Sequence, residues 1–245
     1  MLTNIKKKNP KVLVGIGVAS QFDYVIDKCL KTVFEQDYDN FDVLLMDNSK
    51  DSTYHLTLMS KFPKAIIEHF KRPIYFRDAL TQAREKIKDY AIIHGYDYLL
   101  FVDVDHILKP DTITKLISHK KDFITACIGY LHQDYSTCFI RDWSETKPSF
   151  VPGLSPCKPI YYEEMKKPPF LMEIMCCGLA CALIKVPVLL GMHFYNSHKQ
   201  TAFMEDLIFC SDLQKKGIKL FLDKTVNPFH MHVMMAERVH RNTKS

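Results

Sequence analysis

Residues 98–106 read YLLFVDVDH, and this stretch decides the fold class. Its first five side chains are apolar, which is typical of a strand that is buried on both faces of a parallel sheet. The strand runs directly into Asp103 and Asp105, so two carboxylates stand at its carboxyl end. Ligands of open α/β sheets bind beyond the carboxyl ends of the strands. The stretch therefore predicts a parallel sheet with an acidic ligand site.

The residues before this stretch alternate between strand and helix patterns. Residues 11–18, 41–46 and 65–70 are apolar runs that predict strands. Residues 22–34 and 78–94 carry apolar side chains at helical spacing. This alternation predicts an α/β fold with a Rossmann-like, mostly parallel sheet and helices on both faces.

The second half of the chain is less regular. Strands are expected at residues 123–130, 137–140 and 218–222, and a helix at residues 204–216. Residues 146–170 contain six prolines and predict a long irregular segment. Loops of that length in a compact domain are usually functional lids or disordered segments.

The composition excludes several classes of protein. The 245 residues carry 33 Lys and Arg against 28 Asp and Glu, a net charge of +5, which is too small and too dispersed to indicate a nucleic-acid partner. No apolar stretch approaches the ~20 residues that a membrane span requires, and no secretory signal follows the lysine-rich start. We therefore expect a cytoplasmic protein. The basic ends, residues 6–8 and 233–244, are expected to be solvated tails, with weak contact to a membrane surface as the alternative.

The eight cysteines do not indicate a disulfide scaffold in a chain of this length. Cys176, Cys177 and Cys181 lie in one apolar segment, without the second pair of ligands that zinc sites usually have. We expect these three side chains to pack in the core as small hydrophobic groups.

Two pairs of residues are candidate metal ligands. Asp103 and Asp105, with one residue between them, can both reach a hard divalent cation such as Mg²⁺ or Mn²⁺. His230 and His232 follow the last expected strand and are able to complete the same coordination shell. Each pair also has a simple structural interpretation, as a solvated turn or as surface histidines on one face of an extended segment.

Four further residues are candidates for binding or catalysis. Glu205 and Asp206 start a helix, where acidic residues are favoured by the macrodipole, and one of them is able to act as a general base. Asp47 at a strand end can accept hydrogen bonds from a nucleobase or ribose, and Arg84 can pair with phosphates. Taken singly, Asp47 and Arg84 are also explained as a cap and a surface charge.

Five stretches occur in one order: LLMDNSKD, ALTQAREK, YLLFVDVDH, GLACALIKVPVL and FMEDLIFCSDLQKKGIKLFLD, followed by a late histidine. This series resembles a GT-A fold glycosyltransferase and is similar to glycosyltransferase family 2, the inverting family that includes cellulose synthase. The resemblance covers residues 11–232. It implies the transfer of a hexosyl group from a UDP- or GDP-sugar to an acceptor hydroxyl, with Mn²⁺ or Mg²⁺ as cofactor.

The resemblance also implies how the chain is divided. Residues 1–245 would form one catalytic domain, with a nucleotide-binding half at about 11–106, an acceptor half at about 107–232 and a tail at 233–245. The acceptor half matches only loosely, so a glycan, a lipid-linked sugar and a protein all stay open as acceptors.

The resemblance assigns roles on the donor side. Asp47 would contact the nucleobase, and Arg84 would lie near the donor. Asp103 would touch the ribose or the metal, and Asp105 would ligate the metal.

On the acceptor side, Gly178 would begin the loop that shapes the acceptor site, and Asp206 would be the catalytic base, with Glu205 beside it. A late histidine would be a further metal ligand. His232 is preferred over His230 for that role, without strong ground from the sequence.

The chain departs from the family pattern at Asn48, where a second Asp is common, and at Glu85, where Asn is common. Two alternative functions remain open. Residues 103–108, DVDHIL, also resemble the nucleophile motif of haloacid dehalogenase-type phosphatases, although His106 stands where that motif has Gly. The other alternative is a protein that binds a nucleotide without catalysis.

Overall fold

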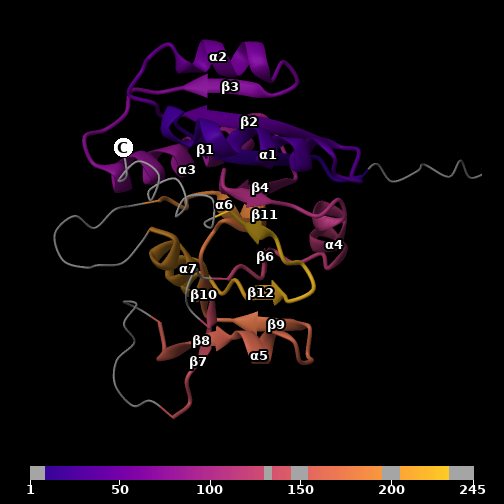
Figure 1. Cartoon of the computed structure of the whole chain (residues 1–245). Coiled ribbons are helices and arrows are strands. Elements are labelled where there is room, and N and C mark those ends of the chain that lie inside the picture. Colours follow the sequence, from indigo (N-terminus) through magenta and orange to yellow (C-terminus); the bar gives the residue numbers. More distant parts are fainter. Residues whose placement is uncertain (1–8, 130–133, 145–153, 195–204, 232–245) are drawn as a thin grey trace, which may run out of the picture.

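The computed structural model describes residues 9–129, 134–144, 154–194 and 205–231. Its centre is an eight-stranded sheet (Figure 1) with the strand order β3 (Ile66–His69), β2 (Phe41–Asp47), β1 (Val12–Val18), β4 (Tyr98–Val102), β11 (Cys181–Lys185), β6 (Phe123–Ala126), β12 (Leu220–Asp223) and β9 (Leu171–Ile174). The first four strands run parallel. Strand β11 is antiparallel to both of its neighbours, β12 is parallel to β6, and β9 is antiparallel to β12. The predicted α/β fold with a mostly parallel sheet is confirmed.

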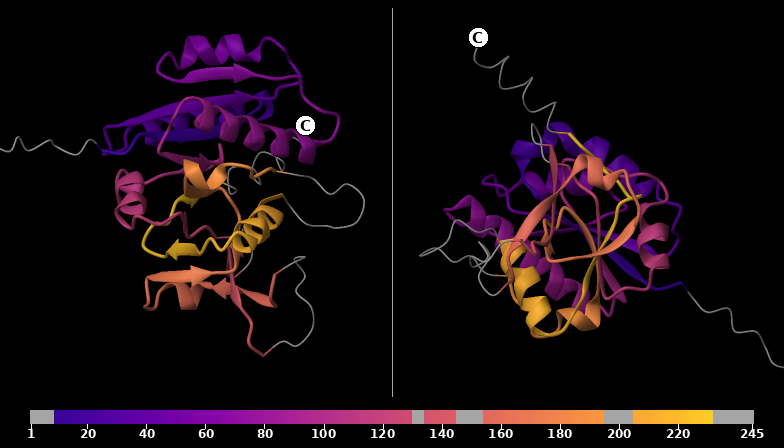
Figure 2. Two further views of the ribbon diagram at one scale, coloured as in Figure 1. Left: turned by 180° about the vertical axis from the view of Figure 1, so that it is seen from behind. Right: turned by 90° about the horizontal axis from the view of Figure 1, so that it is seen from below.

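Helices cover both faces of this sheet, because successive side chains of a strand point to opposite faces and both sets are apolar. One face carries α1 (Asp23–Phe34), α2 (Tyr54–Lys61) and α4 (Thr112–Ser118). The other face, seen from behind in Figure 2, carries α3 (Phe76–Ile93), α6 (Val186–Leu189) and α7 (Glu205–Lys215). In β1, Val12 and Val14 pack on the first face and Leu13 on the second.

Helix α3 packs closely on the central strand β1. A Cβ atom on Gly15 would lie 2.2 Å from Cγ2 of Ile87, so only glycine fits at this crossing. This close packing fixes α3 beside the carboxyl ends of β1 and β4, where one of its side chains, Arg84, joins the site described below.

A small second sheet has the order β10 (Cys176–Cys177), β7 (Tyr135–Arg141) and β8 (Cys157–Tyr161), and the short helix α5 (Tyr162–Met165) follows β8. The prediction of an irregular segment over residues 146–170 is therefore wrong for residues 157–165, whereas residues 166–170 are irregular as expected. Pro159 does not prevent strand formation, because β8 lies at the edge of its sheet and edge strands tolerate proline. Residues 145–153 lie outside the described part of the chain.

The cysteines behave as expected. Cys176, Cys177 and Cys181 are fully buried and unpaired by disulfides. Across the described residues, no helix has both the length and the apolar character that crossing a bilayer requires.

Candidate active site

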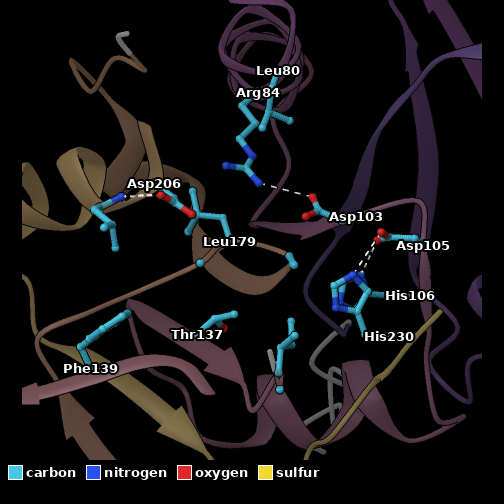
Figure 3. Close-up of a pocket in the computed structure, with 15 residues that line it drawn as sticks. Leu80, Arg84, Asp103, Asp105, His106, Thr137, Phe139, Leu179, Asp206 and His230 are labelled. Atoms are coloured by element: carbon cyan, nitrogen blue, oxygen red, sulfur yellow. Dashed lines mark hydrogen bonds and ion pairs between the residues drawn. The ribbon is translucent and has the colours of Figure 1, made fainter. Parts of the chain in front are cut away.

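The carboxyl end of β4 opens into a cavity of about 280 Å³, which we call the central cavity (Figure 3). It brings together six residues predicted from the sequence: Arg84, Asp103, Asp105, Gly178, Asp206 and His230. The rest of its wall consists of Leu80, His106, Ile128, Gly129, Thr137, Phe139, Leu179, Ala180 and Leu207. Residues from both halves of the chain therefore meet in one cavity.

Arg84 joins two carboxylates at one side of this cavity. Its guanidinium forms a buried ion pair with Glu205, and its Nη2 lies 3.3 Å from Oδ1 of Asp103. Burial opposes the positive charge, but Glu205 and Asp103 hold the pKa of Arg84 above its usual range. Arg84 is therefore a fixed cation that neutralises Glu205 and orients Asp103.

Asp206 is the carboxylate of the pair at the start of α7 that reaches the cavity. Its Oδ1 accepts a hydrogen bond of 2.8 Å from the amide of Leu207. Burial, together with the neighbouring Glu205, raises the pKa of the Asp206 carboxyl to about 7, although the charge of Arg84 opposes this shift. A carboxyl with such a pKa is suited to accept a proton near neutral pH.

Gly178 leaves space beside this carboxyl group. A Cβ atom built on Gly178 would lie 3.6 Å from Oδ2 of Asp206 and 3.4 Å from Cβ of Thr137. A methyl group there would make ordinary van der Waals contacts with both side chains, so the glycine leaves the space between Thr137 and Asp206 unfilled.

A second group of side chains gathers around Asp105, at the opposite side of the cavity (Figure 3). Two short strands, β5 (His106–Ile107) and β13 (Phe229–His230), pair so that His106 lies opposite His230. Their rings stack with centroids 4.3 Å apart. Nδ1 of His106 lies 2.9 Å and Nε2 of His230 lies 3.1 Å from the two carboxylate oxygens of Asp105. Backbone pairing thus places two imidazoles against one carboxylate.

The environment of Asp105 keeps its carboxylate charged. Burial opposes the charge, yet the two close imidazoles hold the pKa of Asp105 well below its usual range. The buried His106 has no well-aligned hydrogen-bond partner for either ring nitrogen among the described residues. One ligand atom from each of Asp105, His106 and His230 lies within 4.8 Å of the other two. A carboxylate and two imidazoles fit a divalent transition metal better than they fit Mg²⁺, which prefers oxygen ligands.

Asp103 stands between the central cavity and a neighbouring cavity of about 160 Å³, which we call the side cavity. The side cavity is lined by Gly17, Val18 and Ala19 at the end of β1, by Phe22, Asn48 and Val104, and by Leu80, Asp103 and Asp105, which also line the central cavity. The carboxyl ends of β1 and β4 thus provide two adjoining spaces that share the carboxylates of Asp103 and Asp105.

Asp47, like Glu205, is a predicted site residue that lines neither cavity. It is fully buried, its Oδ1 accepts hydrogen bonds from the amide and the hydroxyl of Ser49, and its Oδ2 lies 2.8 Å from Nδ1 of His69. The next residue, Asn48, lines the side cavity instead. Direct contact between Asp47 and a nucleobase stays a prediction, as does the preference for His232, which lies outside the described residues.

The sequence interpretation missed His106 as a site residue. It follows the two aspartates directly, but its neighbours give it no distinguishing pattern, and its partner His230 is more than a hundred positions away. The available signal is that His106, like His230, is itself a potential metal ligand, and that it directly follows Asp105.

The family model for glycosyl transferase family 2 matches residues 24–190 of the chain. Among solved structures, TarS 1-349 from S. aureus in complex with UDP aligns with a TM-score of 0.54 and 16% identity over 86% of this chain and 57% of that one. GalNAc-T7 with UDP, GalNAc and Mn²⁺ aligns with a TM-score of 0.65 and 12% identity over 91% of this chain and 44% of that one. The chain thus spans about half the length of these two structures. No sequence of a curated protein matches it significantly.

Proposed function

The chain belongs to glycosyl transferase family 2, and we propose that it transfers a sugar from a nucleotide-sugar donor to an acceptor hydroxyl, with a divalent metal and with inversion at the anomeric carbon. The observation that carries this proposal is the arrangement of the central cavity. Three side chains able to ligate a metal, Asp105, His106 and His230, lie at one side, and Asp206, whose carboxyl group is suited to accept a proton, lies at the other.

On the donor side, Asp105, His106 and His230 would hold the metal, and Asp103 would contact the ribose or the metal. A bound divalent metal supplies positive charge that stabilises the departing diphosphate. The side cavity beyond Asp103 is the space we assign to the nucleoside. Asp47 would support this space through the loop that it fixes, because Asn48 forms part of its wall.

On the acceptor side, Asp206 would accept the proton of the attacking hydroxyl. The acceptor oxygen forms a bond to the anomeric carbon as the bond from that carbon to the diphosphate breaks, and the proton goes to Asp206. Attack from the face opposite the leaving group inverts the anomeric centre. Glu205 is already paired with Arg84, so we assign it to holding Arg84 and α7 in place rather than to proton transfer.

Neighbouring structures bound to UDP favour a UDP-sugar as donor, with a GDP-sugar as the alternative. We keep the division into a nucleotide-binding half before residue 107 and an acceptor half after it, and we place the enzyme in the cytoplasm. A glycan, a lipid-linked sugar at the inner face of a membrane and a protein stay open as acceptors.

A thermal-shift panel of nucleotide sugars, with and without Mn²⁺, tests the proposal, because a ligand that binds only the native state raises its stability. We expect one UDP- or GDP-sugar to raise the melting temperature in the presence of Mn²⁺, and the Asp105→Ala variant to lose this response. If no nucleotide sugar stabilises the protein, the proposal fails. If the protein instead hydrolyses phosphomonoesters and Asp103→Asn abolishes this, the phosphatase alternative is correct.

A further inference from the structure

A second group of potential metal ligands lies outside the central cavity. It is located at the edge of the main sheet where β2 and β3 pair and α2 packs beside them (Figure 1). It consists of Asp47, His55 and His69, and one ligand atom from each lies within 4.8 Å of the other two. We propose that these three residues bind a second divalent transition-metal ion, separate from the one at Asp105.

The backbone brings the three side chains together. In the parallel pairing of β2 and β3, Asp47 and His69 are direct partners at the carboxyl ends of the two strands. Oδ2 of Asp47 lies 2.8 Å from Nδ1 of His69. His55 lies in the first turn of α2, and its ring stacks on that of His69 with centroids 5.1 Å apart.

The chemistry of these groups suits a metal such as Zn²⁺ or Co²⁺. Two imidazoles and one carboxylate are the three protein ligands found in open zinc sites, where a fourth position is left for water or another ligand. Among the described residues, the buried Nδ1 of His55 has no hydrogen-bond partner, so a polar atom next to the other two groups is left unsatisfied. A metal ion would satisfy it.

The carboxylate of Asp47 is also held in the way that metal-ligating carboxylates usually are. The amide of Ser20 donates to Oγ of Ser49, and the hydroxyl of Ser49 donates to Oδ1 of Asp47. The amide of Ser49 donates to the same oxygen at 2.9 Å. These bonds fix the carboxylate and leave Oδ2 directed at His69.

One of the three ligands, His69, lines an open cavity of about 640 Å³ together with Ser49. The cavity gives a metal ion access to the site from the side of His69. Its wall also carries Lys50, Lys71 and Arg72, and these cations favour an anion as the fourth ligand.

Metal stoichiometry tests the inference, and the test does not depend on the proposed transferase activity. Tag-free protein is dialysed against Co²⁺, and the bound metal is counted. We expect two ions per chain in the wild type, one in His55→Ala and one in the double variant Asp105→Ala/His230→Ala, which removes the ligands at the central cavity. The His94→Ala variant is the matched control, because His94 is exposed and belongs to neither group, and it should still bind two ions.

Titration of the double variant measures the second site alone. His55→Ala in this background should weaken Co²⁺ binding by at least about 100-fold, since the loss of even an outer hydrogen-bond partner of a ligand costs 10–100-fold. His69→Gln keeps a side-chain donor for Asp47 but removes the imidazole, so it should weaken Co²⁺ binding as well. This variant replaces His55→Ala in the test if His55→Ala does not fold. The inference is wrong if the double variant binds no Co²⁺, or if both histidine variants bind as the wild type does. If the wild type binds only one ion and His55→Ala binds none, the site at Asp47, His55 and His69 is supported and a metal at Asp105 is not.

Discussion

Arg84 of α3 and Glu205 of α7 form a buried ion pair between residues 121 positions apart. The pair connects the two halves of the chain at the wall of the central cavity. Because Arg84 neutralises Glu205, the adjacent Asp206 is the acidic side chain of α7's first turn that faces the cavity, and within the described part of the chain it forms no ion pair of its own.

The first prediction concerns the stability that this pair provides. Glu205→Gln leaves a buried guanidinium without its closest carboxylate, and breaking a buried pair typically costs about 3 kcal/mol or more in the free energy of unfolding. Urea denaturation measures this. The control is Glu173→Gln, which removes an exposed ion pair in which Oε2 of Glu173 lies 3.0 Å from Nζ of Lys219. This substitution should change the free energy of unfolding by less than about 1 kcal/mol. Equal effects of the two substitutions would contradict the role assigned to Glu205.

The second prediction concerns the general base. Asp206→Asn keeps the size of the side chain but cannot accept a proton, so turnover should fall about 10²–10⁴-fold. Affinity for the donor should change little, since Asp206 is assigned to the acceptor side. Steady-state kinetics and calorimetric titration with the donor separate the two effects. Near wild-type transfer by this variant, or a product that keeps the anomeric configuration of the donor, would rule out a single-base inverting mechanism.

The third prediction concerns pH. Asp206 must be deprotonated to act as a base, and burial together with Glu205 raises its pKa to about 7. At saturating donor, metal and acceptor, the logarithm of kcat should therefore rise with unit slope up to about pH 7 and level off above it. Donor affinity measured at each pH shows whether metal binding contributes to the profile. A kcat that is constant between about pH 5 and 8 would show that Asp206 is not the group that titrates.

The fourth prediction concerns the metal ligands. His106→Ala and His230→Ala should each weaken Mn²⁺-dependent donor binding at least about tenfold, because each removes an imidazole next to Asp105. His94→Ala should have no effect. Mn²⁺, a transition metal, should support tighter donor binding than Mg²⁺, because Mg²⁺ prefers oxygen ligands to imidazoles. Unchanged binding in both variants would mean that the stacked pair is structural, and His232→Ala tests the ranking made from the sequence.

The sequence predicts the strands and the two long helices of the first half because their information is local, but it does not predict the short helix α2. The uninterrupted apolar run of residues 98–102 alone indicates a strand in a sheet that is covered on both faces. The aspartates that follow it therefore lie at the carboxyl end of this strand, where the cavity opens. The helix at residues 78–94 is equally local, since its apolar stripe alone requires a face to pack against. Arg84 is therefore placed correctly once the helix is.

The parts that escaped prediction depend on contacts between distant segments. His106 becomes a site residue only because β13 pairs with β5, which brings His230 to within 3.1 Å of Asp105, 125 positions away. The partners of Asp47 depend on the register of β2 against β3. Strand β8 escapes prediction because the prolines of residues 146–170 suggest a loop, and only the edge position of β8 in the small sheet explains why its one proline, Pro159, is tolerated.

Calorimetric titration of UDP and of GDP, with and without Mn²⁺, into the wild type and Asp105→Ala tests the central claim most directly. If Asp105, His106 and His230 hold the metal that stabilises a nucleoside diphosphate, one of the two nucleotides binds the wild type tightly only when Mn²⁺ is present. The Asp105→Ala variant should then bind with the weak affinity that the wild type shows without the metal. Equal, metal-dependent affinity in the wild type and the variant would contradict the account.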